Sequence, residues 1–174
     1  MWVLYPNFSM RDLSRLQELG DILLLLSPNQ FDMQAHYHPK DSDPAPLTQF
    51  DLLFAKIEIV NCALGWAAMY EPFQKQGLSV NKYSGVYSTT GLVYEDQEND
   101  SCYYHDQAAR EFFKLSQTEV EWIFCAMFYP PKNRYSLSAV VERIEKLVRN
   151  NGMDEKDEKE YNFFYQEMLT DILF

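Results

Sequence analysis

Residues 137–148 read Leu137-Ser-Ala-Val-Val-Glu-Arg-Ile-Glu-Lys-Leu-Val148. The aliphatic side chains of this stretch recur three and four residues apart, which is the spacing of one face of an α-helix, and charged residues fall between them. Asn150-Asn151-Gly152 follows, and asparagine and glycine commonly end helices. We therefore expect an amphipathic helix that buries one face in a core.

The same spacing recurs along most of the chain. Ser9–Asp12, Thr48–Asp51 and Ser116–Glu119 have the form of capping boxes, which open helices. The segment that starts at Thr48 is the least polar, and we expect it at the centre of the fold. The stripes and boxes together predict helices over about 9–26, 48–72, 104–115, 116–130, 137–150 and 161–172.

Two segments depart from this pattern. Residues 27–47 contain four prolines, so we expect a long loop there. Residues from about 78 to 95 are rich in β-favouring side chains and contain Gly85 and Gly91, which predicts a small β-hairpin. The expected fold is a single globular domain over residues 1–174, mainly α (α+β), as a compact bundle of five to six helices with one small β-hairpin insertion.

The chain is strongly acidic. It has 174 residues with 26 Asp and Glu against 15 Lys and Arg, a net charge of -11. Residues 95–174 hold 17 acids and 9 bases, a net of -8. Direct nucleic-acid binding is disfavoured, since phosphate affinity requires clustered basic side chains. With 47% hydrophobic residues, the chain is not an acidic disordered tail either.

Cysteine usage and hydropathy bear on the compartment. Cys62, Cys102 and Cys125 are an odd number without the spacing of a disulfide framework. We find no secretory signal pattern, and the longest apolar stretch, residues 50–69, is interrupted by charged residues where a membrane span needs about 20 nearly uncharged ones. The sequence therefore predicts a cytoplasmic protein with reduced thiols and no membrane segment.

Two acidic stretches, residues 95–100 and 154–160, both precede predicted helices. Acids at a helix start are stabilised by the helix dipole, which explains part of the pattern. Tyrosines lie close to both stretches, and tyrosine is a frequent anchor at protein interfaces, although the rings could equally serve only to fill the core. We interpret the chain as a protein-binding module, such as a small inhibitor, an immunity-type protein or a regulator, that docks on a basic protein partner. The candidate contact residues are Glu95, Asp96, Glu98, Asp100, Tyr103, Tyr104, Asp154, Glu155, Asp157, Glu158 and Tyr161.

The alternative is a transition-metal-binding protein or metalloenzyme. His36 and His38 lie two residues apart, and Cys102 and His105 lie three apart, which would make them neighbours on a helical face. Together these four side chains would suit zinc or another transition metal. No enzyme class has a motif in this sequence, so the main expectation is a binding protein without a cofactor. A subunit that buries an apolar patch in a homo-oligomer is a third hypothesis.

Overall fold

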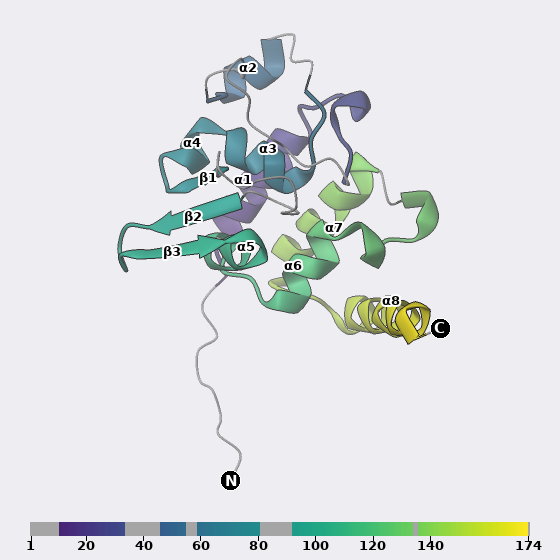
Figure 1. Cartoon of the computed structure of the whole chain (residues 1–174). Helices are drawn as coiled ribbons and strands as arrows, with labels where there is room; N and C mark the ends of the chain where they lie inside the picture. Colours follow the sequence, from purple (N-terminus) through teal and green to yellow (C-terminus); the bar gives the residue numbers. More distant parts are fainter. Residues whose placement is uncertain (1–10, 34–45, 55–58, 81–91, 134–135, 174) are drawn as a thin grey trace.

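The computed structural model describes residues 11–33, 46–54, 59–80, 92–133 and 136–173. These residues form a mainly α fold with a small antiparallel sheet, which confirms the predicted fold class (Figure 1). The α-helices are α1 (Leu13–Leu23), α2 (Gln49–Phe54), α3 (Ala63–Met69), α4 (Glu71–Gln74), α5 (His105–Phe113), α6 (Gln117–Phe124), α7 (Leu137–Asn150) and α8 (Glu155–Leu173). Short 3-10 helices are η1 (Pro28–Gln30), η2 (Ala126–Phe128) and η3 (Pro131–Asn133).

The core lies between α1, α3, α5, α6 and α7. The stripe on α7 behaves as its spacing predicts, because Val140, Val141, Ile144 and Leu147 are all buried. Helix α1 packs directly against α7. Edge-to-face ring contacts join Phe73 of α4 to the two phenylalanines at the end of α5, so the aromatic residues extend the core to the sheet.

The sheet has three strands in the order β1 (Leu78–Val80), β2 (Leu92–Asp96) and β3 (Ser101–Tyr104). The third strand lies outside the predicted hairpin. Residues 95–100 therefore form the end of β2 and a turn into β3, and the prediction that a helix follows them directly was wrong. Asp96 holds this turn, because its buried carboxylate accepts hydrogen bonds from the backbone N–H groups of Glu98 and Asn99.

The continuous helix predicted over residues 48–72 was also wrong. The Thr48–Asp51 box does open α2, with Thr48 Oγ1 donating to Asp51 Oδ2 at 2.6 Å. However, α2 ends at Phe54, and Asn61 instead forms a parallel bridge with Phe31 before α3 begins. Backbone pairing with a segment 30 residues away cannot be seen in helical spacing.

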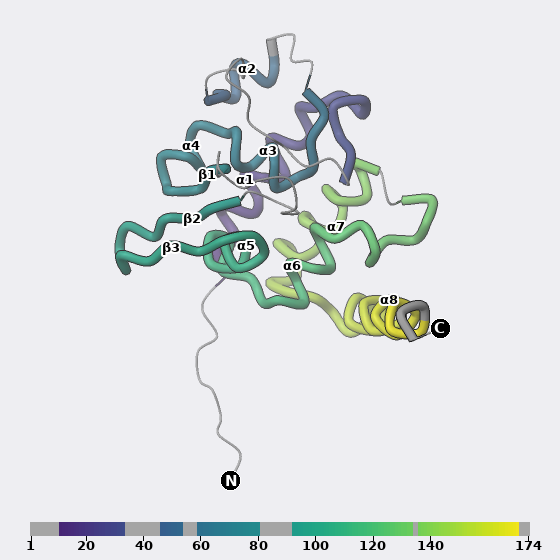
Figure 2. Tube along the Cα trace, viewed as in Figure 1, coloured from purple at the N-terminus to yellow at the C-terminus, as the bar shows by residue number. Residues whose placement is uncertain are grey.

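Helix α8 differs from the other long helices. It lies at the edge of the molecule, where it contacts η2 (Figure 2). Over residues 155–170, for which burial is described, Asp157 is its only fully buried residue. Phe163, Tyr165 and Leu169 are exposed over its second half. No helix among the described residues has both the length and the apolar character of a membrane span.

Candidate functional site

The two acidic stretches lie on different sides of the molecule. In Figure 1 the turn between β2 and β3 is at the left edge, whereas the start of α8 is at the lower right. They therefore do not form one continuous acidic face. Each stretch has its own surroundings, and these decide which carboxylates are available to a partner.

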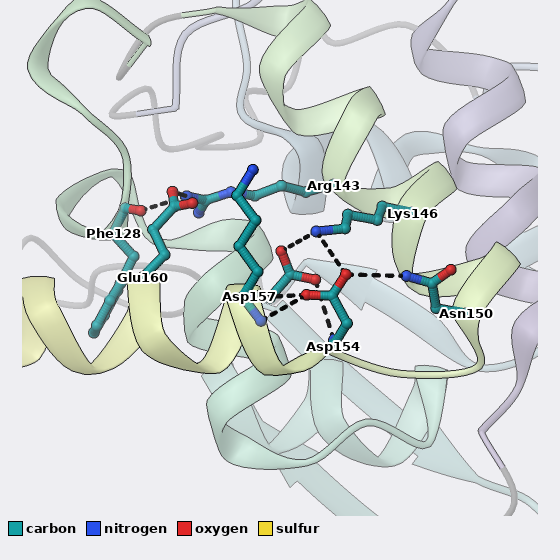
Figure 3. A network of polar contacts seen from close by, with 8 residues as sticks. Phe128, Arg143, Lys146, Asn150, Asp154, Asp157 and Glu160 are labelled. Atoms are coloured by element: carbon teal, nitrogen blue, oxygen red, sulfur yellow. Dashed lines mark hydrogen bonds and ion pairs between the residues drawn. The ribbon is translucent and has the colours of Figure 1, made fainter.

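Most acids at the start of α8 are engaged within the chain (Figure 3). Asp154 caps the helix, because its Oδ1 accepts hydrogen bonds from the N–H groups of Lys156 and Asp157, each at 2.9 Å. Lys146 of α7 forms ion pairs with both Asp154 and Asp157. The backbone hydrogen bond from Asp157 and the ammonium of Lys146 hold the pKa of Asp154 below its usual range. Of the other acids, Glu155 pairs with Lys159 and Glu158 is exposed.

Arg143 extends this network into the core. Its guanidinium donates to the carbonyl oxygens of Trp122 and Phe128 and forms a 2.7 Å ion pair with Glu160 of α8. It also lies over the rings of Trp122 and Tyr129, with 3.7 Å from Cζ to the Tyr129 centroid. One side chain therefore ties α6, η2, α7 and α8 together, which gives this acidic stretch a structural role.

Two of the candidate tyrosines are also engaged. Tyr161 stacks on Phe128 with a centroid separation of 4.6 Å, and its hydroxyl donates to Glu121 at 2.6 Å. Partial burial, and then the hydrogen bond to Glu121, raise the pKa of Tyr161. Tyr103 stacks on Tyr94, whose ring lies in the core. Neither ring is freely presented to a partner.

The β2–β3 hairpin offers a different surface. Glu95, Glu98 and Asp100 are exposed and form no ion pair with any residue in the described ranges. In the strand register Glu95 lies opposite Cys102, which places both side chains on the face that also carries Tyr104. Tyr104 is 50% exposed, and a hydrogen bond with Cys102 raises the pKa of its hydroxyl, so the ring is neutral at physiological pH.

Asp106 is also exposed, at the start of α5, but this helix packs through Phe112 on Tyr94, on the other face of the sheet from Tyr104. The turn pair Asn99-Asp100 between two runs of β-favouring residues was the signal that could have revealed the hairpin and hence this neighbourhood. We call Glu95, Glu98, Asp100 and Tyr104 the acidic hairpin surface.

The structure bears on only one of the two residue pairs of the metal hypothesis. His36 and His38 lie outside the described residues. Cys102 has an exposed thiol on β3, and His105 is the first residue of α5 with a left-handed φ of 54°. The prediction that both share a helical face was wrong, since only His105 is helical. Within the part of the chain that the structure describes, no three side chains of the metal-binding types gather at one point.

Comparison of this chain with protein-family models, with curated proteins and with solved structures gives no match.

Proposed function

We propose that this protein is a binding module that docks on a basic protein partner through the acidic hairpin surface, as a small inhibitor, immunity-type protein or regulator. The observation that carries the proposal is the group of three exposed carboxylates on the β2–β3 hairpin, Glu95, Glu98 and Asp100, which form no ion pair with a described residue, together with the half-exposed ring of Tyr104 on the same hairpin. The three cysteines are free thiols, which supports the cytoplasmic location that we also propose.

The carboxylates would act mainly on the rate of association. Exposed like charges on one surface attract an oppositely charged partner over about 8 Å at physiological salt and raise association rates by roughly 10- to 1,000-fold. Tyr104 would then supply the buried contact, since an aromatic ring loses little conformational entropy when it packs against a partner. The start of α8 would contribute less, because Asp154 and Asp157 already pair with Lys146.

The partner can be identified by photocrosslinking. A benzophenone side chain replaces Tyr104 in the full-length protein, and the crosslinked protein is identified after irradiation of the producing cells. We expect one dominant basic protein, not obtained when the same side chain replaces Glu145 on α7. A product shared by both positions, or an acidic partner, would contradict the proposal.

Charge reversal then tests the mechanism with that purified partner. The variant Glu95→Lys/Glu98→Lys/Asp100→Lys should slow association at least about tenfold at about 50 mM salt. The control Asp21→Lys/Glu145→Lys/Glu167→Lys changes net charge equally at exposed sites on α1, α7 and α8. It should slow association less than about threefold. Equal effects of the two variants would show that only net charge matters and that the hairpin is not the contact surface.

The metal hypothesis keeps its own test. A protein that holds zinc through His36, His38, Cys102 and His105 must contain the metal in a fixed ratio after purification, and His36→Ala must release it. Elemental analysis without a stoichiometric transition metal would remove this alternative. Light scattering on the same sample measures the mass and so tests the homo-oligomer hypothesis, for which Phe163 is the most exposed aromatic residue of α8.

A further inference from the structure

A pocket of about 300 Å³ opens between η3, α7 and α8. In Figure 1, α7 and α8 lie to the right of strands β2 and β3. Trp122 and Tyr129 form the apolar wall of the pocket, and Lys132, Glu142, Arg143 and Lys156 are among its charged lining residues. Lys146 also lines the pocket. Four of the eleven described Lys and Arg residues therefore line it. The lining also holds Glu142, Asp157 and Glu160, so its charged groups sum to a small positive charge in a chain of net charge -11.

The lysines of the pocket differ from the others. Of the six described lysines, Lys75, Lys114, Lys146 and Lys159 each have a carboxylate oxygen within 4 Å. The two others, Lys132 and Lys156, have no such partner among the described residues, and both line the pocket. In a protein with 26 acids, unpaired lysines should be scattered if they have no role. Lys132 and Lys156 therefore both present an unpaired ammonium group to the same pocket, where an anionic ligand would meet them.

The remaining charges of the pocket are largely neutralised internally. Arg143 pairs with Glu160 and Lys146 pairs with Asp157, and Figure 3 shows Arg143 and Lys146 reaching from α7 toward α8. These pairs hold the wall in place and leave Lys132 and Lys156 as the free positive groups. Glu142 is exposed and forms no described ion pair, so it is available to accept a hydrogen bond from a ligand.

Trp122 supplies an independent observation. It is 1% exposed and lines the pocket, and its Nε1–H has no acceptor among the described residues. A buried donor without a partner costs about 1–3 kcal/mol, so such donors are rare in native proteins. Trp122 is therefore a buried lining residue whose hydrogen-bond donor no described residue uses.

We propose that this pocket binds a small, hydroxylated phosphate monoester, such as a phosphorylated sugar. The phosphate group lies between the ammonium groups of Lys132 and Lys156, and a ligand hydroxyl donates to Glu142. Phosphate monoesters carry a charge of about -1.5 to -2 at neutral pH and are therefore matched by two lysines. A volume of about 300 Å³ is at the small end of ligand pockets, which excludes dinucleotides.

The test uses ribose 5-phosphate as the probe, with ribose and inorganic phosphate as its two halves, at constant ionic strength. The ¹⁵N–¹H signal of the Trp122 indole, assigned by its loss in Trp122→Phe, reports binding. We expect this signal to shift saturably with ribose 5-phosphate, at a dissociation constant below about 1 mM. Ribose should leave it unchanged, and inorganic phosphate should bind at least about fivefold more weakly than the ester.

Paired variants decide whether the two lysines are responsible. Lys132→Ala/Lys156→Ala should raise the dissociation constant at least about tenfold. Lys75→Ala/Lys159→Ala removes the same charge from side chains that are 70% and 74% exposed, and should change it less than about twofold. All four lysines are outside the core, so both variants should fold. Absence of a saturable shift up to about 10 mM, equal weakening by both variants, or equal binding of inorganic phosphate would overturn the proposal.

Discussion

Replacement of Arg143 should be among the most damaging single changes in this protein. In Arg143→Ala the carbonyl oxygens of Trp122 and Phe128 lose their charged donor in a buried setting, at about 1–3 kcal/mol each. The contacts with the buried Trp122 and Tyr129 rings add about 0.5–2 kcal/mol each. Together these losses predict a decrease of about 4 kcal/mol in the free energy of unfolding.

Urea denaturation followed by far-ultraviolet circular dichroism measures this decrease. With a dependence of about 2 kcal/mol per molar urea, the midpoint should fall by about 2 M. Arg143→Lys should lose roughly half as much, because one ammonium cannot donate to three acceptors in the geometry of a guanidinium. The control Arg149→Ala removes an exposed arginine six residues further along α7 and should cost less than about 0.5 kcal/mol.

The variant Glu160→Gln separates the carbonyl contacts from the ion pair. The side chain of Glu160 is 35% exposed, so the loss of its charge should cost less than about 1 kcal/mol. If Glu160→Gln destabilised the protein as much as Arg143→Ala, the ion pair would dominate and the reasoning from the carbonyl oxygens would be refuted. A loss below about 1 kcal/mol in Arg143→Ala would refute it as well.

Two further predictions concern the acidic cap of α8 and a glycine beside the sheet. The pKa of Asp154 is lowered from 3.8 in the folded protein, so its stabilising contribution is complete above about pH 4 and is lost as the pH falls below that. Between about pH 5 and about pH 2.5 the urea midpoint of Asp154→Asn should therefore fall less than that of the parent, and an equal fall would contradict the capping role. Gly77 has a φ of 97°, and a Cβ atom there would lie 2.2 Å from the carbonyl oxygen of Glu95. Gly77→Ala should lower the free energy of unfolding by about 2 kcal/mol or more in the same assay. An unchanged midpoint would show that the backbone shifts at little cost to avoid the clash with Glu95.

The sequence predicted those parts of the fold that depend on neighbouring residues. The Ser116–Glu119 box is present as predicted, with Ser116 Oγ accepting from Glu119 N–H and the Glu119 carboxylate accepting from Ser116 N–H. The α7 stripe is buried for the same local reason. The prediction failed at Asn61, where pairing with the distant Phe31 prevails over helical spacing.

For the candidate surfaces too, the sequence predicted some features and not others. Residue types and their density directed attention to the stretches 95–100 and 154–160. The sequence could not show that Asp154 and Asp157 meet Lys146 or that Tyr161 stacks on Phe128, because those contacts depend on how η2, α7 and α8 pack. It could equally not show that Lys132 and Lys156 line one pocket, since exposed lysines have no periodic pattern.

The uneven anchoring of α8 implies that the helix opens from one end. The capping box at Asp154 and the Arg143–Glu160 pair fasten its first turns, whereas Phe163 and Leu169 project into solvent. Backbone amides near Tyr161 should therefore exchange with solvent deuterium slowly, and those beyond Leu169 should exchange quickly through fraying that leaves the rest of the fold intact. A molecule that binds the last turns of α8 would slow this exchange. The exchange rate of the amides beyond Leu169 therefore reports whether that end of α8 is bound.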